Sequence, residues 1–142
     1  MTIATILETK GPEVIGVEAD TIVRDAIELL GARRIGALPV LREGEVIGMF
    51  SERDVISCLR REGAGMLEWP VGQVMTAPAI TADPRMSALA GLSLMTERRI
   101  RHLPVVQEGR LIGIVSIGDL VKHRMDRIEA EAAAMRTYIQ TA

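Results

Sequence analysis

Two Ser-x-x-Asp sequences, at 51–54 and 116–119, have the residue types and the spacing that could do chemistry in this chain. The spacing fits a capping box, in which the serine oxygen accepts a backbone N–H at a helix start. Gly48 or Gly113 lies three residues ahead of each serine, which would let a ligand approach the backbone closely. Helix starts also bind anions, and a carboxylate one turn inside the helix could accept two ribose hydroxyls. Both interpretations, helix cap and nucleotide site, remain open on these residues alone.

Arginines close to both sequences could supply phosphate contacts, because the guanidinium group binds phosphate in a planar fork. Arg53 lies inside the first sequence, and Arg101 and His102 lie at the start of a predicted strand. We expect these three residues to contact phosphate. Arg33 and Arg98 lie at the ends of predicted helices, where cations are favoured without any ligand. We expect those two to be solvated.

Both Ser-x-x-Asp sequences belong to an internal repeat with a period of 65 residues, the separation of the two aspartates. Moving the chain along itself by that distance matches residues 33–35 with 98–100 and residues 38–40 with 103–105, without a gap. Two copies are too few for an array that is stabilised by stacking. We therefore predict two similar units that form a pseudo-twofold pair and share one core.

The apolar pattern of each unit predicts the order β-α-β-β-α, an α/β (α+β) fold. Apolar residues spaced as on one face of a helix indicate the first helix, and a Glu-Gly pair indicates a tight hairpin. In the first unit the expected strands are 14–17, 37–41 and 46–50, and the expected helices are 23–30 and the segment from Ser51; the second unit repeats this order. A short helical turn at 3–7 precedes them.

The repeat divides the chain into a first unit at 1–62, a connector at 63–74, a second unit at 75–122 and a helical extension at 123–142, within one compact module. Apolar residues of the last helix recur at alternating steps of four and three, which is a heptad seam. The seam consists of Val121, Met125, Ile128, Ala132, Met135 and Ile139. We expect it to dock against another subunit; folding back on its own module is the alternative.

Composition excludes several classes of partner. A net charge of −2 and a pI near 5.7 provide no basic surface for nucleic acid. No apolar run approaches the roughly 18 residues of a membrane span, and no secretory leader is recognisable. Cys58 is the single cysteine, so no disulfide can form within the chain. We expect a cytoplasmic protein that contacts neither nucleic acid nor membrane.

The sequence offers little to a catalytic or metal site. His102 and His123 are isolated from other metal-ligating residues, and no P-loop or Rossmann fingerprint occurs. We expect His123 on the surface. These observations favour a protein without catalysis and without a bound metal.

The repeated Gly-x-x-Ser-x-x-Asp motif, the Leu-Pro-Val strands ahead of it and the Val-Met-Thr sequence at 74–76 resemble a tandem pair of cystathionine-beta-synthase (CBS) domains, also called a Bateman module. The resemblance runs from about Thr2 to Val121. It implies two β-α-β-β-α units joined by their sheets. It also implies two clefts for adenosine-containing ligands: AMP, ADP, ATP, S-adenosylmethionine or NAD. Most such modules regulate an attached enzyme, channel or transporter, and here the match is to a stand-alone pair.

The resemblance implies roles for individual residues. Asp54 and Asp119 would hold ribose, the two motif serines would contact ribose or phosphate, and Ile15 and Ile80 would flank adenine. Arg101 matches a frequent phosphate contact, whereas its counterpart in the first unit is a glycine, so the two clefts should differ in phosphate affinity. The residues assigned to ligand binding are Lys10, Val14, Ile15, Ile35, Gly36, Ala37, Leu38, Pro39, Ser51, Arg53, Asp54, Thr76, Ala79, Ile80, Ile100, Arg101, His102, Leu103, Pro104, Ser116, Ile117 and Asp119.

The function we expect is a non-enzymatic sensor of an adenine nucleotide, with AMP as the first candidate. Its signal would pass through a homodimer or through an unidentified protein target. One alternative is an interaction module that acts through its C-terminal helix without a ligand. A nucleotide-hydrolysing enzyme is the less favoured alternative.

Overall fold

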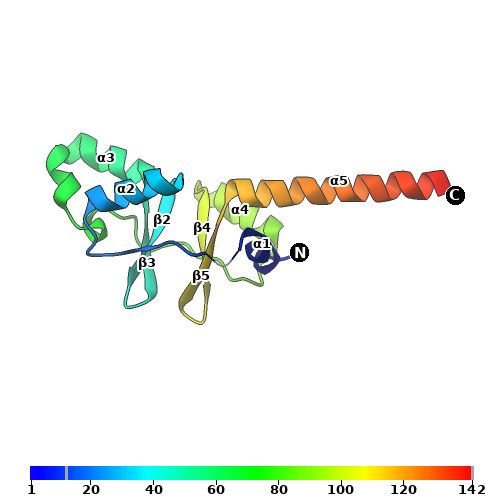
Figure 1. The fold of residues 1–142 in the computed structure, drawn as a ribbon, viewed down its shortest axis with the longest axis horizontal. Coiled ribbons are helices and arrows are strands. Elements are labelled where there is room, and N and C mark those ends of the chain that lie inside the picture. Colours follow the sequence, from blue (N-terminus) through cyan, green and yellow to red (C-terminus); the bar gives the residue numbers. More distant parts are fainter. Residues whose placement is uncertain (12, 142) are drawn as a thin grey trace.

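Two α/β units lie side by side, and a long C-terminal helix projects from the second of them (Figure 1). The computed structural model describes residues 1–11 and 13–141. In chain order the elements are α1 (Ile3–Lys10), β1 (Val17–Glu18), α2 (Val23–Arg33), β2 (Ala37–Arg42), β3 (Glu45–Ser51), α3 (Glu52–Glu62), the short 3₁₀ helices η1 (Ala64–Glu68) and η2 (Val71–Gln73), α4 (Ala88–Arg98), β4 (His102–Gln107), β5 (Arg110–Ser116) and α5 (Ile117–Thr141). The predicted order of elements is confirmed, and α1 extends the helical turn expected at 3–7.

Each unit is built on an antiparallel hairpin. In the first unit β2 pairs with β3, and β1 adds a parallel edge through Val17 beside Val40. In the second unit β4 pairs with β5 in the equivalent register. Both hairpins close through two residues with positive φ, a glutamate at 51–52° followed by a glycine at 78–82°. Positive φ at both central positions is typical of the type I′ turn, which matches the twist of paired strands.

The first strand of each unit is shorter than the sequence indicates. A strand was expected at 14–17, but β1 covers only two residues, and its counterpart is a single bridge between Ala82 and Val105. Pro39 and Pro104 explain this, because the next ladder bond toward the N-terminus would need an N–H that proline lacks. On the other side, the Ala19 N–H donates to the Leu41 carbonyl at 3.0 Å, whereas Pro84 stands at the equivalent place in the second unit.

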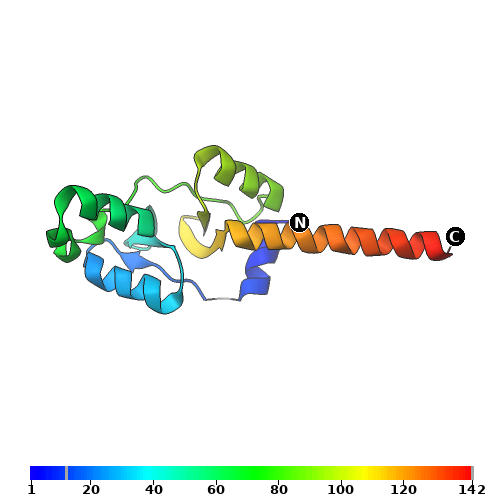
Figure 2. The same ribbon diagram turned by 90° about the horizontal axis from the view of Figure 1, so that it is seen from above.

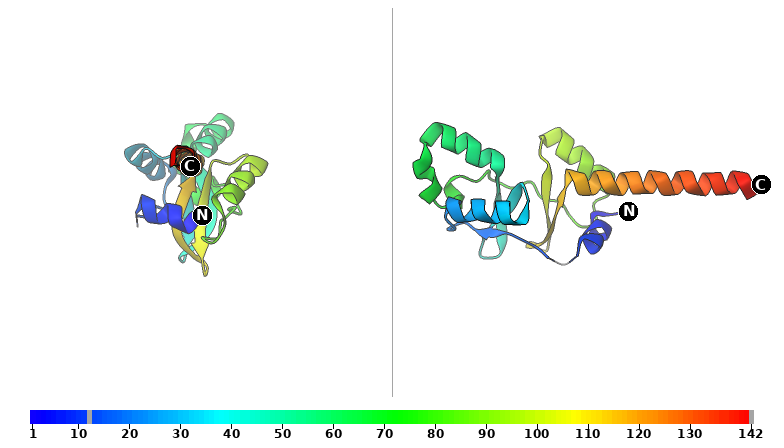
Figure 3. Two further views of the ribbon diagram at one scale, coloured as in Figure 1. Left: turned by 90° about the vertical axis from the view of Figure 1, so that its right-hand side faces the viewer. Right: turned by 45° about the horizontal axis from the view of Figure 1, so that its top comes forward.

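Two separate apolar clusters form the interior, so the prediction of one shared core was wrong. Each cluster includes residues from outside its own hairpin and helices. The first contains α2, β2, β3 and α3 together with Met66 and Val71 of the connector. The second contains α4, β4, β5 and the start of α5 together with Ile3 and Ile6 of α1. The N–H of Ile3 donates to the Met86 carbonyl at 2.8 Å, which fixes α1 to the second unit. Although α1 begins the predicted range 1–62, it therefore completes the core of the second unit (Figures 2 and 3).

Gly48 lies where residues 75–76, directly after the connector, cross β3. A Cβ atom on this residue would come within 2.8 Å of the Thr76 carbonyl oxygen and 2.7 Å of the Met75 sulfur. Thr76 and Met49 exchange two backbone hydrogen bonds at this crossing, of 2.8 and 2.9 Å. The sequence interpretation assigned the space over Gly48 to a ligand, but Met75 and Thr76 of the same chain fill it.

The helix α5 leaves the second unit as a straight rod of 25 residues (Figure 1). Leu120 is buried in the second core, and every residue from 124 to 141 is exposed. The expected extension, whose last residue lies outside the described part of the chain, thus projects outward and does not fold back on its own module. His123, expected on the surface, is half-buried at the base of the rod. Among the helices that the structure describes, none is both long and apolar enough to cross a membrane.

The crowding at Gly48 leads to a stability prediction. Replacing Gly48 with alanine should lower the free energy of unfolding by about 1–3 kcal/mol, as overpacking does, because a backbone carbonyl blocks the added methyl group. Gly31 is the matched control, since it lies inside α2 with no heavy atom within 4 Å of the added Cβ. Gly31→Ala should raise stability by up to about 1 kcal/mol. Urea unfolding followed by circular dichroism measures both, and equal effects would contradict the packing argument.

Candidate functional site

A cleft of about 290 Å³, here called the first cleft, lies where the two units meet. One wall is the junction between β3 and α3, and the other comes from the segments around residues 76–80 and 98–102. The first cleft brings together half of the residues assigned from the sequence. They are Gly36, Ala37, Ser51, Arg53, Asp54, Thr76, Ala79, Ile80, Ile100, Arg101 and His102.

The Asp54 carboxylate is held in one position by three donors. Its Oδ2 accepts the Ser51 backbone N–H at 2.9 Å and the Ser51 hydroxyl at 3.0 Å, while the Asp54 N–H donates to the Ser51 Oγ at 3.3 Å. The predicted capping box is therefore confirmed. The other carboxylate oxygen of Asp54, Oδ1, accepts the Thr76 hydroxyl at 2.8 Å. These bonds connect the start of α3 with the segment that enters the second unit, and they leave a fixed anionic acceptor at the cleft wall.

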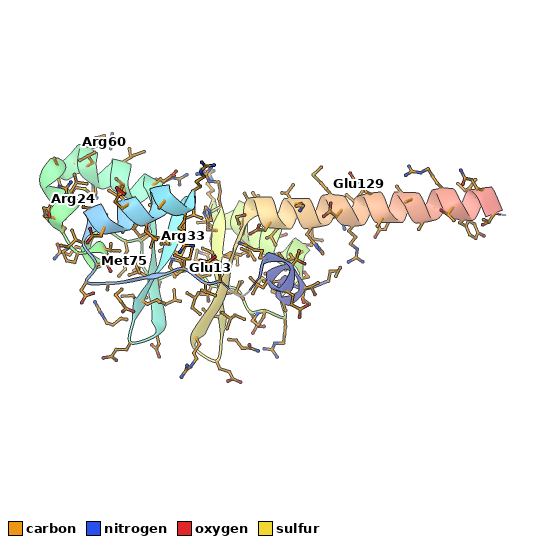
Figure 4. All side chains as sticks on the ribbon, in the orientation of Figure 1. Glu13, Arg24, Arg33, Arg60, Met75 and Glu129 are labelled. Carbon is orange, nitrogen blue, oxygen red and sulfur yellow. The ribbon has the colours of Figure 1, made fainter. Side chains whose placement is uncertain are left out.

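Positive side chains gather on the facing wall of the first cleft. Arg98, Arg99 and Arg101 line it beside His102, and Arg53 lies on the Asp54 side. Arg98, which was expected to be solvated at a helix end, is exposed at the end of α4 and also lines the cleft. The other residue given that role, Arg33, pairs with Glu13 on the outer surface (Figure 4). Four guanidinium groups around one cleft outnumber the two carboxylates of Glu52 and Asp54 that line it, so the wall suits an anionic ligand.

His102 lies between the charges of this wall. Burial lowers the pKa of its imidazole, and the nearby positive charges of Arg101 and Lys10 lower that pKa further. His102 is therefore mostly neutral at pH 7, since its pKa begins from an ordinary value near 6.5. An anion bound beside it would reverse part of this shift.

The second junction, between β5 and α5, repeats the capping box with a different third donor. The Asp119 Oδ2 accepts the Ser116 N–H at 2.8 Å, and the Asp119 N–H donates to the Ser116 Oγ at 3.1 Å. Here the Lys10 ammonium donates to the Ile114 carbonyl at 2.8 Å and to the Asp119 Oδ2 at 2.9 Å. Lys10 of α1 therefore donates to the motif aspartate and to a carbonyl of the preceding strand, as Thr76 does at the first junction.

Asp119 is the carboxyl whose ionisation this arrangement changes. Its partial burial disfavours the charged form, but the hydrogen bonds from Lys10 and Ser116 and the charge of Lys10 outweigh burial and hold its pKa below the usual value. Asp119 is therefore a carboxylate that already forms an ion pair with the Lys10 ammonium.

A second, larger hollow of about 510 Å³, here called the second cleft, borders the second junction. Of the assigned residues it contains Ile35, Gly36, Arg101, His102, Ser116 and Ile117. Gly36, Arg101 and His102 line both clefts, together with Glu52. The two clefts therefore share a wall at the centre of the molecule.

The remaining assigned residues line neither cleft. Leu38, Pro39, Leu103 and Pro104 are buried in β2 and β4. Ile15 packs against the first core and Val14 is exposed beside it, while Lys10 and Asp119 lie at the second junction. Their assignment to ligand binding stays a prediction.

Sequence reasoning did not include five residues that line the first cleft, namely Met49, Glu52, Pro78, Arg98 and Arg99. The available signal was the pseudo-twofold arrangement itself. The junction of one unit faces the turn before the proline-containing strand of the other, so the arginine pair at the end of α4 lies opposite Asp54.

Residues 1–11 and 13–141 contain no group of three His, Cys, Asp or Glu side chains arranged to hold a metal ion.

Comparison with protein families gives one match that spans most of the chain. The family model described as "CBS domain" matches residues 8–61 and again residues 71–126. The CBS domain-containing protein CBSX3 of Arabidopsis thaliana, which is named as mitochondrial, is 33% identical over 98% of this chain and 72% of its own length.

Two solved structures share the architecture. The crystal structure of a CBS-domain containing protein from Agrobacterium tumefaciens is 36% identical, with a TM-score of 0.81 over 87% of this chain and 92% of that one. The CBS domain pair of protein MJ0100, solved in complex with 5′-methylthioadenosine and S-adenosyl-L-methionine, superposes with a TM-score of 0.78 over 89% of this chain and 98% of that one. At 22% identity the second likeness concerns the fold alone.

The Lys10–Asp119 pair leads to a prediction about pH. Because the pKa of Asp119 is lower in the folded chain than in the unfolded chain, the pair stabilises the fold at neutral pH and loses its effect as the pH falls. Lys10→Met should lower the unfolding free energy by about 0.5 kcal/mol at pH 7, since both side chains are partly exposed, and by less below about pH 4. Chemical denaturation between pH 3 and 7 measures this difference.

The control for this prediction is Arg24→Met, which removes the more exposed ion pair between Arg24 and Glu68. That change should have almost no effect at any pH. A Lys10→Met effect that is constant from pH 7 to pH 3 would show that the carboxylate is not its origin.

Proposed function

The chain belongs to the CBS domain family, and from that membership we propose that it is a non-enzymatic regulatory module that binds a phosphorylated adenosine in the first cleft. AMP is the first candidate, with ADP and ATP as larger relatives. The observation that carries this proposal is the chemical difference between the two walls of the first cleft. One wall holds the fixed Asp54 carboxylate, and most of the arginines lie on the other.

The two walls of the first cleft match the ribose, phosphate and base of a nucleotide. Asp54 has acceptor oxygens for ribose hydroxyls, and Arg99 and Arg101 can donate to phosphate oxygens. Ile80 and Ile100 provide apolar surface for a base between them. The described residues leave the cleft open to such a ligand, since Gly36 and Ala37 contribute little side-chain bulk to its lining.

Charge favours a phosphorylated ligand over the ligands of protein MJ0100. S-adenosylmethionine carries a positive sulfonium and no phosphate, so the arginines of the first cleft would repel the sulfonium centre. The ligands of MJ0100 both contain adenosine, which supports an adenosine-containing ligand for this chain. The arginines of the first cleft support a ligand that also carries phosphate. NAD also contains adenosine and carries two phosphates that the same arginines could bind, so it is included among the ligands to be compared.

The two clefts should bind with different affinities. Asp119 already carries the Lys10 ammonium, so a ribose at the second junction would compete with an ion pair. The first unit also has Gly36 and Ala37 where the second has Arg101 and His102. We therefore expect the first cleft to fill at the lower ligand concentration.

The proposed output is a change in assembly rather than a reaction. The Ser51 hydroxyl is engaged in the capping box. Among residues 1–11 and 13–141, those that line the two clefts include no nucleophile with a paired base. The signal would pass through a homodimer or a protein target in the cytoplasm. An interaction module that works without a ligand is the second candidate, favoured by the exposed seam of α5.

Calorimetric titration of ligand-free protein with AMP, ATP, NAD and S-adenosylmethionine tests the proposal. We expect AMP or ATP to bind, and Arg101→Met to weaken that binding about 10-fold, since a hydrogen bond to a charged group contributes about 1.5–3 kcal/mol. Arg60→Met is the matched control, because Arg60 is exposed on α3 away from the clefts (Figure 4). If none of the four compounds binds, or if Arg60→Met weakens binding equally, the proposal fails.

The pKa of His102 provides an independent check. A bound phosphate adds negative charge beside the imidazole and raises its lowered pKa toward the ordinary value, so binding takes up a proton. The affinity for AMP should therefore increase as the pH falls from 7.5 to 6. Phosphate titrates in the same range, so His102→Gln is the reference that isolates the imidazole. Equal pH dependence in both proteins would place the phosphate elsewhere.

A further inference from the structure

The exposed seam of α5 is an apolar feature that the clefts do not use. It begins at the base of the helix and runs outward, with exposed fractions of 56% for Met125, 60% for Met135 and 67% for Ile139. In heptad notation Val121, Ile128 and Met135 occupy d positions, and Met125, Ala132 and Ile139 occupy a positions. A continuous a/d stripe over this length fits one partner helix.

The seam is turned away from the module. Leu120 and His123 are the α5 residues that pack toward the second unit. At roughly 100° per residue the seam lies about 130° around the helix from them. A partner helix could therefore lie along α5 without displacing the core that holds its first turn.

The free part of α5 also needs a partner for its own stability. Residues 124–141 form no contact with the body of the module that would bury them, and most of the stability of a helix in a protein comes from packing of its apolar face. One helical ion pair, between Arg127 and Glu131 at 3.3 Å, supports it from its own surface. Burying the seam would supply the missing stabilisation.

The charges beside the seam suit a second copy of α5 and disfavour a fully overlapped antiparallel pair. In a parallel coiled coil, each g residue lies opposite the e residue five positions later on the other helix. This pairs Arg124 with Glu129 and Glu131 with Arg136 of a second copy, and all four contacts are attractive. A fully overlapped antiparallel pair would instead place Lys122 opposite Arg136 and Glu129 opposite itself.

We propose that α5 forms a parallel, in-register two-stranded coiled coil with α5 of a second copy of this chain. The coiled coil would hold two modules at the same end of the rod. It gives an interface to the homodimer proposed above, and so rests on that part of the proposed function. Ligand binding is measured separately, so either conclusion can fail without the other.

A shifted antiparallel pair is the arrangement to exclude. Placing Val121 opposite Ala132 also brings opposite charges together, but it leaves Met135 and Ile139 beyond the shared seam. In that arrangement the two Ala132 residues would stand about 16 Å apart along the axis, 11 residues at 1.5 Å each. In the parallel arrangement they face each other in one layer.

Sedimentation velocity of the full chain over a range of concentrations is the first measurement. We expect a reversible dimer that Ile128→Lys weakens at least 10-fold, about 1.4 kcal/mol, by placing a charge in the seam. Ala130→Lys adds the same charge on the opposite side of α5 and should leave the dimer unchanged. A monomer at every concentration, or a dimer that Ile128→Lys does not affect, would overturn the proposal.

Oxidation of Ala132→Cys then determines the direction. The native Cys58 is buried, so the new thiol is the one available for cross-linking. A parallel pair should form a disulfide-linked dimer rapidly, and the neighbouring Ala133→Cys, outside the seam, should form much less. If the dimer depends on Ile128 but Ala132→Cys does not cross-link, the helices are not parallel and in register, and the proposal is wrong. Circular dichroism confirms that each variant keeps its modules folded.

Discussion

The hydrogen bonds at the Asp54 carboxylate are the interaction on which the rest of this structure depends. One carboxylate accepts from the first residue before α3 and from Thr76, where the chain enters the second unit. Gly48 permits this crossing because it has no side chain to block the Thr76 carbonyl. The carboxylate that caps α3 therefore also binds the segment that leads into the second unit. They also leave the carboxylate aimed at the space between them, so the first cleft is a direct result of how the units are joined.

The duplicated sequence makes the molecule nearly symmetric, and single residues break the symmetry. Thr76 is a neutral donor at the first junction, whereas Lys10 places a positive charge at the second. Pro84 removes an N–H that Ala19 has in the first unit, which limits the second parallel strand to one bridge. Each change is local, but together they give two junctions of the same shape with different charge. A duplicated domain can therefore offer one ligand two sites of unequal affinity.

Much of this arrangement could be predicted from the sequence, because the decisive signals are local. The type I′ hairpins, the capping boxes and the arginine-ended helices follow from residues within a few positions of each other. The first strand could not be placed correctly, because its length depends on a missing N–H at Pro39 in a different strand. The role of Arg98 was also missed, since its neighbours in the first cleft come from the other unit. Gly48 shows the same limit. The glycine indicates that something approaches the backbone closely, and only the fold identifies Met75 and Thr76 as the residues that do so.

The second junction and the projecting rod are parts of one helix. Asp119 caps the first turn of α5, and the seam begins at Val121, two residues later. A ligand that draws Lys10 away from Asp119 would change the electrostatics of that first turn and remove one of the bonds that hold α1, which packs in the same core as Leu120. Because α5 is a continuous helix, a small rotation of its first turn would rotate the seam with it. Ser116, which lines the second cleft, and Asp119, which is bonded to it, thus connect that cleft to the base of the helix that carries the seam.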